Sequence, residues 1–474
     1  MRVLLRLALG LSPMLGTAQP QAVPPSSPQS PSPAEDPFLQ SLILEALQRN
    51  PDLAKSRSLT EAEQERVPQS KALPDPNLSL GIQNDGFKDL QIGKMETSFY
   101  QVMLTQPRPW PGKRGKRGEI ASTSVEIAKV GVDRTRLSLE ADVKRAYYGL
   151  LLVRDQLALL EEQAKFLEQA QAVTKVRYEV GQGSQADLLR AQLERNRLNQ
   201  SRKGLLGQEK GLVAALNRLR GITEMVPIPT SRSLASVAVA PRTVQEALAQ
   251  AESASPELKA ARLGVRQAEQ NLDLAKLERR PDFAVSAGVM PRGSLDPMWQ
   301  VGFAISLPVW SKNKQQRAVS EQEWRRRSQG SEVESVHNLL VQRVQERSAQ
   351  LDAALETLGI YRGGLLIQSE ASFRATMVQY EAGRVPFLSV LETLNGWVAD
   401  QSGMLQTLAQ AVALQIADEE VNLGSAPSIS VQGLASPSIG MGGGSAGSGA
   451  VSAASSSKPA TAANSGGGSP MKSM

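Results

Sequence analysis

Among its 474 residues the sequence has no cysteine, a single histidine and few aromatic residues, which make up only 4% of the chain. The lack of cysteine excludes disulfide bonds, thiolate zinc sites, a thiol nucleophile and the acylated cysteine of a lipoprotein. One histidine, His337, cannot build a histidine-rich metal site, and we expect it to be an ordinary residue on a helix surface. These absences predict a protein without a bound cofactor.

Catalytic motifs are missing as well. No serine, histidine and aspartate set and no paired carboxylates stand out, and Gly112-Lys113-Arg114 lacks the spacing of a phosphate-binding loop. The net charge is only +6, and basic residues alternate with acidic ones except in a short basic cluster from Lys113 to Arg117. We therefore expect neither an enzyme nor a nucleic-acid-binding protein.

Long hydrophobic runs are also absent. No segment approaches the 18 or so apolar residues that a transmembrane helix requires. Residues 1–18 have the pattern of a secretory signal peptide, with Arg2 and Arg6 before a short apolar run and small residues at its end. Residues 19–37 are rich in proline and serine and are predicted to be extended or disordered. If the mature chain meets a membrane, it must do so through β-strands.

Four segments alternate large apolar residues with small or polar ones, at about 76–85, 98–109, 281–290 and 299–309. Their apolar positions include Tyr100, Val102, Leu104, Phe283, Val285, Trp299, Val301, Phe303 and Ile305. A period of two predicts strands with one apolar face, and about nine to eleven residues let a tilted strand cross a bilayer. Turn-forming residues from Pro291 to Pro297 join the last two segments, which predicts a hairpin.

The two strand pairs belong to a tandem repeat, which we place at residues 38–240 and 241–423. In each copy short helices precede the strands and a long helix follows them, at about 118–180 and 318–382. Apolar residues from Leu139 to Leu167 step by four and three, which predicts a left-handed coiled coil on a helix about 90 Å long. The second long helix has the same stepping, interrupted by Arg347, whose charge we expect to reach solvent at the edge of the seam.

Both long helices end on similar residues, from Tyr178 to Gly181 and from Tyr380 to Gly383. Glycine at this place is typical of a left-handed helix cap. We expect Ser184 to cap the returning helix of the first copy in a capping box with Asp187. In the second copy Pro386 should take the first helical position. These features predict the tips of two helical hairpins.

Together the elements predict a mainly α-helical protein with a membrane β-barrel. Four strands per chain would leave edge amides exposed to lipid, so strands from several subunits must close the barrel. Helices longer than a bilayer must project into an aqueous space, and a barrel continued by a helical cylinder is a tube. The last segment, 424–474, is rich in glycine, serine and alanine and is predicted to be a disordered tail that assembly does not require.

Four motifs occur together in this chain. They are the twofold α-β-β-α repeat, the paired Tyr-x-x-Gly tips, Pro74 to Asn77 before the first strand, and Pro109-Trp110-Pro111-Gly112-Lys113-Arg114 after the second. As a set they resemble the TolC family of outer-membrane efflux proteins, and the last run is similar to that of its cation and heavy-metal efflux branch. The resemblance covers about residues 38–423.

The resemblance implies a homotrimer whose twelve strands form one barrel in outer-membrane lipid, continued by an α-helical barrel in the periplasm. It implies the exit duct of a tripartite efflux or secretion system. The duct would dock to a periplasmic adaptor (membrane fusion) protein and an inner-membrane pump of the resistance-nodulation-division type. Its substrate would be a metal cation or a drug.

The resemblance also implies gate residues at the periplasmic tips. A tyrosine on one hairpin bonded to an aspartate on the other would be Tyr380 and Asp187. The gate arginine of the family has no counterpart, because Val385 stands at its position and Arg384 precedes it. One of the two acidic residues at the aperture is replaced, and Glu392 corresponds to the other. Tyr178, Gly181 and Gly383 complete the predicted tip set.

One other class of protein stays open, a periplasmic adaptor or another coiled-coil scaffold of the envelope. An adaptor would have one helical hairpin and a lipoyl-like domain, without repeated tips or amphipathic strand pairs. Methionines in or beside the strands leave open a soft-metal substrate, although methionine also serves as ordinary apolar filling. These are Met95, Met103, Met290 and Met298.

Overall fold

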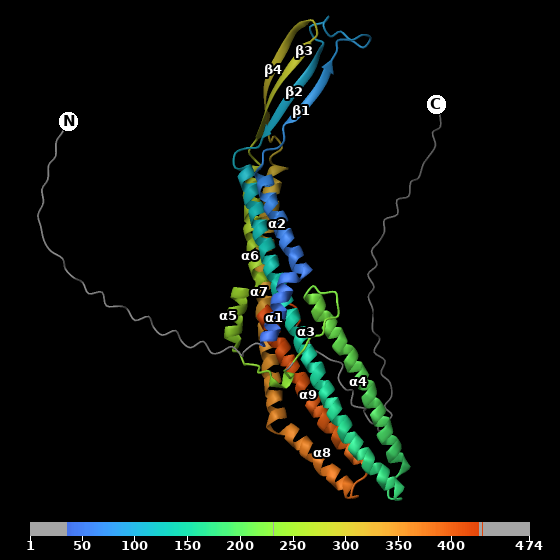
Figure 1. The fold of residues 1–474 in the computed structure, drawn as a ribbon. Coiled ribbons are helices and arrows are strands. Elements are labelled where there is room, and N and C mark those ends of the chain that lie inside the picture. Colours follow the sequence, from blue (N-terminus) through green and yellow to red (C-terminus); the bar gives the residue numbers. More distant parts are fainter. Residues whose placement is uncertain (1–35, 231, 426–428, 430–474) are drawn as a thin grey trace, which may run out of the picture. The chain divides into compact units, whose positions relative to one another are not determined.

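The computed structural model describes residues 36–230, 232–425 and 429, all of which belong to one compact unit of the chain. The predicted signal peptide (1–18), most of the segment 19–37 and most of the predicted tail (424–474) lie outside the described residues. The described part is mainly helical and carries one antiparallel sheet (Figure 1). The predicted combination of long helices and amphipathic strands is confirmed.

Two short helices open each half of the chain, and each begins at a side-chain cap. They are α1 (Pro37–Arg49) and α2 (Pro51–Lys71), then α5 (Val244–Ala254) and α6 (Pro256–Leu277). Asn50 ends α1 and caps α2, because its side-chain oxygen accepts from the N–H groups of Asp52 and Leu53 at 2.8 and 3.2 Å. Ser255 has the same place before α6. Proline follows both caps, at the first helical position where its missing N–H costs nothing.

The strands pair in the order β1-β2-β3-β4, so the two hairpins meet through β2 and β3. Their bounds are β1 (Asn77–Gln83), β2 (Phe99–Arg108), β3 (Asp282–Arg292) and β4 (Leu295–Ser306). The register places Leu80, Val102, Val289 and Trp299 in one row across the sheet. Such rows of cross-strand neighbours build one exposed apolar face, as the alternation predicts. All nine predicted apolar strand residues lie in β2, β3 or β4.

The turn of the second hairpin is shorter than predicted. Asp296 and Pro297 belong to β4 and Pro291 belongs to β3, which leaves Gly293-Ser294 as the turn. Gly293 has a φ of 68°, a left-handed conformation that favours glycine. A Cβ built on it would lie 3.0 Å from the Cα of Gly93 in the loop between β1 and β2. The two loops therefore approach closely through glycines, a long-range contact that turn propensity does not predict.

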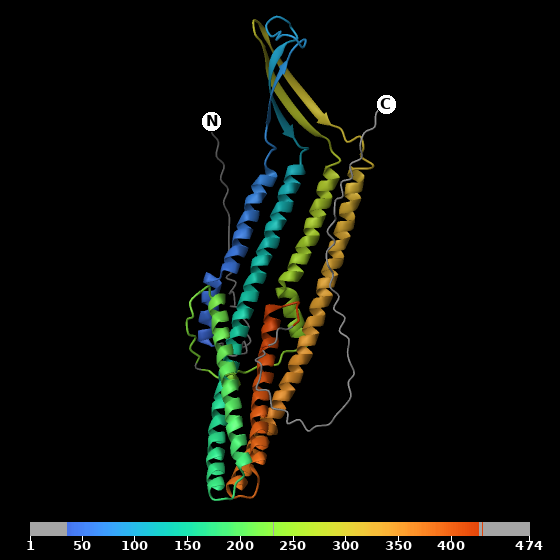
Figure 2. The same ribbon diagram turned by 90° about the vertical axis from the view of Figure 1, so that its right-hand side faces the viewer.

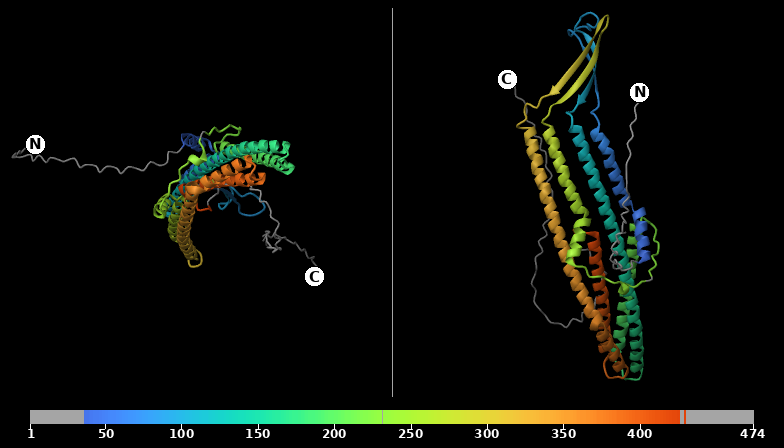
Figure 3. Two further views of the ribbon diagram at one scale, coloured as in Figure 1. Left: turned by 90° about the horizontal axis from the view of Figure 1, so that it is seen from below. Right: turned by 90° about the vertical axis from the view of Figure 1, so that its left-hand side faces the viewer.

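The long helices α3 and α7 start at the sheet and run toward the hairpin tips (Figure 2). The helices of the two hairpins are α3 (Lys113–Glu179), α4 (Gln185–Leu219), α7 (Gln315–Ile360), α8 (Leu366–Glu381) and α9 (Phe387–Glu420). The predicted seam from Leu139 to Leu167 packs in the apolar clusters of the helices. Viewed from below, the helices lie side by side in a curved layer (Figure 3). Within the part of the chain that the structure describes, no helix is both long and apolar enough to cross a membrane.

The second long helix is not continuous, contrary to the prediction of one helix over about 318–382. A π-helical turn, Tyr361–Leu365, separates α7 from α8, and α8 continues in a different direction (Figure 1). The seam is buried as far as Leu358, whereas Leu365 is exposed. A π-turn adds one residue to a turn and so shifts the phase of the seam. Gly403 of α9 leaves room for Tyr361, because a Cβ there would lie 2.5 Å from the tyrosine hydroxyl.

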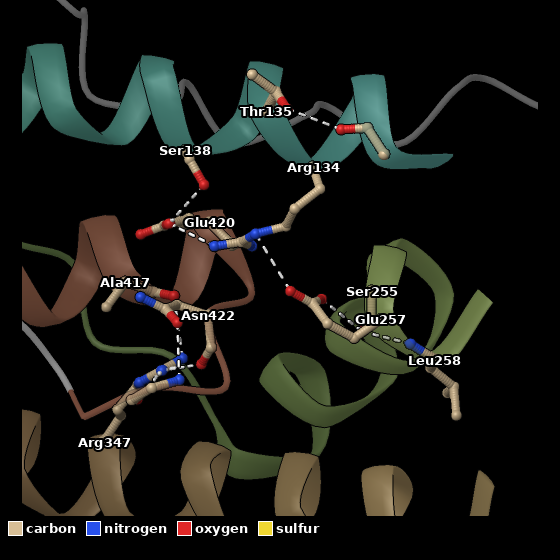
Figure 4. Close-up of polar contacts among 12 residues, drawn as sticks. Arg134, Thr135, Ser138, Ser255, Glu257, Leu258, Arg347, Ala417, Glu420 and Asn422 are labelled. Atoms are coloured by element: carbon tan, nitrogen blue, oxygen red, sulfur yellow. Dashed lines mark hydrogen bonds and ion pairs between the residues drawn. The ribbon is translucent and has the colours of Figure 1, made fainter. Parts of the chain in front are cut away.

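A buried ionic junction joins the end of α9 to α3, α6 and α7 (Figure 4). Glu420 is only 3% exposed. Its carboxylate accepts hydrogen bonds from three α3 side chains, Arg134 at 2.6 Å, Arg145 at 2.7 Å and Ser138 at 3.3 Å. Arg134 also pairs with Glu257 of α6 at 3.2 Å. These donors compensate a buried charge that would otherwise destabilise the fold strongly.

Arg347 of α7 completes the junction, so the expectation that its charge reaches solvent is wrong. The residue is 2% exposed. Its guanidinium donates to the carbonyls of Ala417 at 3.0 Å, Asn422, and Gly424 at 3.2 Å (Figure 4). The free carbonyls at a helix C-terminus carry partial negative charge and need donors. Arg347 can occupy this seam position because the seam of α7 here faces the C-terminal end of α9 and not the side of a helix.

Asp418 is the member of the acidic C-terminus of α9 without a close partner. Its Oδ1 is buried without a hydrogen bond among the described residues, and Nη1 of Arg347 lies 3.7 Å away. Burial raises the pKa of Asp418 and lowers the pKa of Arg347, because each charged form loses solvation. Glu419, by contrast, pairs with Lys144 at 2.7 Å.

One residue of the predicted tail packs against the helices. Ile429 lies against the buried cluster of Ala141, Val412 and Ile416, which come from α3 and α9. The sequence predicts that removal of the chain from Ser425 onward leaves trimer yield and export unchanged. Such a deletion would also remove the Ile429 side chain from this cluster, so it should not be neutral for stability.

We expect Asp418→Asn to raise the thermal midpoint of unfolding at pH 7. The pKa of Asp418 is higher in the folded than in the unfolded protein, so the folded state holds this proton more tightly. The resulting stabilisation is present below the unfolded pKa and is lost as pH rises through the folded pKa. Asparagine removes the buried charge, so the rise in the thermal midpoint should be largest at neutral pH. It should disappear in acid, where Asp418 of the wild type is protonated. Calorimetric midpoints of both proteins across the acid range measure this.

The matched control is Glu419→Gln, which removes an acidic residue that has a close partner in Lys144. This variant should have a midpoint equal to or below that of the wild type at pH 7. A midpoint of Asp418→Asn below that of the wild type would mean that Arg347 depends on the Asp418 charge despite the 3.7 Å separation.

Candidate functional site

The two hairpin tips share one backbone arrangement. The helix that leads into each tip, α3 or α8, is followed by a glycine in the left-handed conformation, with φ of 77° at Gly181 and 76° at Gly383. In both, the glycine N–H donates to the carbonyl of the tyrosine three residues earlier, Tyr178 at 3.0 Å and Tyr380 at 2.9 Å. The next N–H then reaches back five residues in each tip. The repeated sequence therefore forms the repeated helix cap that it predicts.

The two tyrosines differ in their surroundings. Tyr178 is 43% exposed, whereas Tyr380 is 3% exposed. The Tyr380 ring packs against Phe387 of α9 with 5.8 Å between ring centroids, inside an apolar cluster that also includes residues of α3 and α4. Of the two tyrosines, Tyr380 is therefore the one that packs between the α8–α9 hairpin and the α3–α4 hairpin.

A buried hydrogen bond fixes the Tyr380 hydroxyl. Its oxygen lies 2.7 Å from Oγ1 of Thr174 on α3. Thr174 donates its only hydroxyl hydrogen to the carbonyl of Ala170, also at 2.7 Å. Tyr380 is therefore the donor in the bond between the two hydroxyls. Because both side chains are buried, breaking this bond within the chain would leave a donor without water or any other partner.

Arg177 adds a second contact between the same helices. Its Nη1 donates to the Tyr380 carbonyl at 3.2 Å, and its guanidinium carbon lies 5.2 Å from the centre of the Tyr380 ring. The arginine thus places its charge both at the C-terminus of α8 and over an aromatic face, two positions that favour a cation. We call Thr174, Arg177 and Tyr380 the tip latch.

Aromatic packing lies next to the latch within the same cluster. Phe166 of α3 contacts Phe373 of α8 and Trp397 of α9, with ring centroids 5.0 and 5.8 Å apart. The Phe373 and Trp397 rings stack at 5.9 Å. The two hairpins are therefore held by apolar burial in addition to the polar latch, so the latch can modulate their contact without carrying all of it.

The predicted bond between Tyr380 and Asp187 is not formed within the chain. The Tyr380 hydroxyl is bonded to Thr174 instead, and the Asp187 carboxylate lies 3.5 Å from Arg190 of its own helix. The prediction fails because Tyr380 turns into the interface with α3, whereas Asp187 lies on α4 beyond the first tip.

Two predicted helix caps also differ in detail. Ser184 caps α4 by accepting from the N–H of Ala186 at 3.1 Å, one residue earlier than a capping box with Asp187 requires. Pro386 is the cap residue of α9, which begins at Phe387, and not its first helical residue. Both helices nevertheless start within one residue of the predicted position.

The other predicted tip residues lie on the surface. Arg384 and Glu392 are exposed, and among the described residues neither has a side-chain hydrogen bond or ion pair. His337 lies on the surface of α7, as expected, with Nε2 3.0 Å from Glu252. Within residues 36–230 and 232–425, no three histidine, aspartate or glutamate side chains gather as they would around a metal ion.

Sequence reasoning missed Thr174 and Arg177, although one of them carries a usable signal. Thr174 follows Leu167 by seven residues and so occupies the same heptad position of the α3 seam. A polar residue at a seam position faces the partner helix and needs a hydrogen-bond partner there. Arg177 has no comparable signal, because a cation near a helix C-terminus is common on any exposed helix end.

The chain matches a family model described as outer membrane efflux protein over residues 42–223 and 247–421. It is 21% identical over 391 residues to the cobalt-zinc-cadmium resistance protein CzcC of Cupriavidus metallidurans, covering 81% of this chain and 89% of that protein. It is 22% identical over 380 residues to the outer membrane protein TolC of Escherichia coli, covering 75% of this chain and 76% of that one. Among solved structures, the outer-membrane channel OprN is similar with a TM-score of 0.68 at 16% identity, covering 83% of this chain and 91% of that chain.

We expect Tyr380→Phe to loosen the second tip. The substitution keeps the ring and removes one buried hydrogen bond, worth about 1 kcal/mol, so amide hydrogen exchange at residues 378–386 should become about fivefold faster. Thr174→Val should have a larger effect, because it leaves the Tyr380 hydroxyl buried without an acceptor. Exchange followed by mass spectrometry measures both.

The control is Tyr178→Phe, the same change at the equivalent place in the first tip. Because Tyr178 is exposed, exchange at residues 176–184 should stay within about twofold of the wild type. Equal acceleration in the two tyrosine variants would mean that the buried bond to Thr174 contributes nothing specific.

Proposed function

The chain belongs to the outer membrane efflux protein family, and we propose that it exports metal cations as a homotrimer whose tip latch holds the periplasmic end closed. The protein is an outer-membrane channel, the exit duct of a tripartite efflux system, and it extends from the outer membrane into the periplasm. The family relationship agrees with the TolC resemblance of the sequence motifs. The proposal adds the assembly, the partners, the substrate and the gate.

The trimer is supported by the edges of the sheet. Among the described strands, β1 and β4 each pair with only one neighbour. A strand edge in lipid leaves backbone N–H and C=O groups unsatisfied at a cost of several kcal/mol each, by an order-of-magnitude estimate. Pairing β4 of one chain with β1 of the next satisfies both edges. Three chains then give a closed barrel of about twelve strands, a size compatible with a lumen.

An adaptor and a pump are the proposed partners. The first tip exposes apolar side chains that no described residue covers, namely Val176, Tyr178, Val180, Leu189 and Leu193. Apolar side chains clustered at the end of a helical hairpin are typical of a surface that packs against other helices. We assign this surface to the helical hairpin of a periplasmic adaptor, which would link the duct to an inner-membrane pump of the resistance-nodulation-division type.

The tip latch is the observation that carries the gating proposal. It joins α3 to α8 through one buried hydrogen bond and one arginine bonded to a helix end. Opening the tips would require α8 and α9 to move away from α3, which breaks both contacts in every subunit. Breaking a buried bond of this kind costs about 1–3 kcal/mol in each subunit. Summed over three subunits, this cost is comparable to the free-energy change of about 5.5 kcal/mol that takes the ratio of closed to open channels from 1:99 to 99:1.

Metal cations are the proposed substrate. The similarity to a cobalt-zinc-cadmium resistance protein supports this class over drugs. Methionines on the small-residue face of the sheet add a weaker argument: Met290 and Met298 are directly paired between β3 and β4, and Met103 lies opposite Gly288. Thioether sulfur is a weak ligand that would not retain a passing cation for long.

We expect Tyr380→Phe to raise the single-channel conductance of the purified trimer in planar bilayers, because it weakens the closed tip in each subunit. Tyr178→Phe should have the conductance of the wild type. An unchanged conductance in Tyr380→Phe, with trimers intact by native mass measurement, would contradict a gate at this latch and leave the duct assignment in place.

The substrate class is tested by growth. A host lacking its own duct should regain tolerance to cobalt, zinc or cadmium when it expresses this chain with a cation pump and its adaptor, and intracellular metal should fall several-fold. Growth on a panel of lipophilic drugs, with a drug pump and adaptor, serves as the comparison. Rescue on drugs without rescue on any of the three metals would overturn the cation assignment.

A further inference from the structure

The positive charge of this protein is concentrated where the helices meet the strands. The four crossings are residues 71–77, 108–117, 277–282 and 306–317. They hold eleven lysines and arginines but only three acidic residues, whereas the whole chain has 53 basic and 47 acidic residues. The rest of the chain is therefore slightly acidic, and the crossings account for more than the entire net charge of +6.

The four crossings are contiguous in space, and specific contacts connect three of them. The second is joined to the first by Arg114, whose Nε donates to the Lys71 carbonyl at 2.8 Å. It is joined to the third by Lys113, whose Nζ contacts Asp282 at 2.8 Å and the Arg280 carbonyl at 2.9 Å. The fourth adjoins the third because β3 and β4 are paired at this end of the sheet. The four crossings lie side by side between the helices and the sheet (Figure 2), and we call their cations the basic band.

Most of this charge is not neutralised within the chain. Lys113 is buried and paired, and Lys116 and Arg117 have acidic neighbours. Seven other cations of the band are exposed and, among the described residues, have no ion-pair partner. These are Lys71, Arg108, Arg279, Arg280, Lys312, Lys314 and Arg317. A group of unpaired like charges is unfavourable in the isolated chain, which indicates an anionic partner outside it.

The band lies at the boundary of the apolar strand face. The last apolar pair of the sheet at this end is Phe283 with Ile305, and Leu307 and Val309 continue the exposed apolar surface to Trp310. Trp310 is 77% exposed. The guanidinium of Arg280 lies 6.0 Å from the ring centre of Trp110. Tryptophan beside cations at the end of an apolar strand surface is typical of the level of lipid headgroups.

The opposite end of the sheet has no such charge. The loop at 84–98 and the turn at 292–296 together hold three basic and four acidic residues. The sheet therefore has one strongly basic rim and one nearly neutral rim. Since the helices project into the periplasm, the basic rim is the one at the periplasmic surface of the membrane.

We propose that the basic band binds the anionic headgroups of phospholipids, such as phosphatidylglycerol, in the periplasm-facing leaflet of the outer membrane. Phosphate oxygens would accept hydrogen bonds from the free guanidinium and ammonium groups while the acyl chains cover the adjacent apolar face. This fixes the height of the duct in the bilayer and goes beyond its role in efflux, although it rests on the strands lying in the membrane.

The proposal is tested with the full chain in a neutral detergent. Native mass spectrometry gives the apparent Kd for dioleoylphosphatidylglycerol and for dioleoylphosphatidylcholine, which differ only in headgroup. The wild type should bind the anionic lipid at least about tenfold more tightly, and about 0.5 M salt should remove most of this preference by screening. Inorganic phosphate at millimolar concentration should not displace the lipid, because it lacks the acyl chains.

A triple variant with glutamine at Lys312, Lys314 and Arg317 should lose most of the preference for the anionic lipid. The matched control carries glutamine at three exposed, unpaired cations of α4, namely Arg195, Lys203 and Lys210. It has the same net charge as the triple variant and should keep the wild-type preference. Any one of three results would overturn the proposal. The wild type could have equal Kd values for the two lipids, the two variants could lose the preference for the anionic lipid equally, or inorganic phosphate could displace that lipid fully.

Both variants should have the wild-type conductance in planar bilayers of phosphatidylcholine alone, because their strands and hairpins are unchanged. This measurement separates the two hypotheses. A Tyr380→Phe protein, with its closed tips weakened, that fails to conduct in any bilayer would contradict the duct, whereas conduction without a lipid preference contradicts only the basic band.

Discussion

The buried carboxylate of Glu420 and the guanidinium of Arg347 together determine how the two halves of the chain meet. Glu420 lies at the end of α9 and is held by two arginines of α3, while Arg347 of α7 caps the carbonyls of the same helix end. Three consecutive acidic residues stand here at the C-terminus of a helix, where the helix dipole already disfavours negative charge. The end of α9 can therefore be buried only where cations from α3 and α7 converge. This requirement fixes the level at which α9 packs against both long helices, and with it the position of the tips.

The tips illustrate how a repeated sequence acquires an asymmetric function. Their backbones are closed by the same hydrogen bonds, so both copies supply the same helix end. The difference lies in what each tyrosine meets. Tyr178 faces solvent, whereas Tyr380 finds Thr174 and Arg177 on the helix that belongs to the other copy. One copy thus provides the acceptor and the other the donor, an arrangement that neither copy could form alone.

What the sequence predicted depended on whether a pattern is local. The apolar face of the strands followed from a period of two, because alternation fixes the face of Trp299 or Val301 whatever the strand pairs with. The Tyr-x-x-Gly tips followed from helix-cap chemistry in the same way. Arg347 was misjudged because a heptad position shows which side of a helix is buried, but not that the partner is a helix end. Asp187 was misjudged because a resemblance assigns a position in the chain, and the direction of the Tyr380 side chain depends on the packing of four helices.

The π-helical turn at Tyr361–Leu365 has a consequence for how this chain can change in length. Leu351 and Leu358 are buried one heptad apart, and the same step of seven would lead to positions 372 and 379. The buried residues of α8 are instead Phe373 and Tyr380, each one position later, because the π-turn holds one residue more than an ordinary turn. Loss of a single residue from this turn would therefore restore an ordinary helix and leave Tyr380 facing Thr174. The same one-codon deletion further along α8, before Tyr380, would rotate the tyrosine by about 100° away from its partner. The tolerance of this hairpin to a change in length thus depends on which side of the π-turn the change falls.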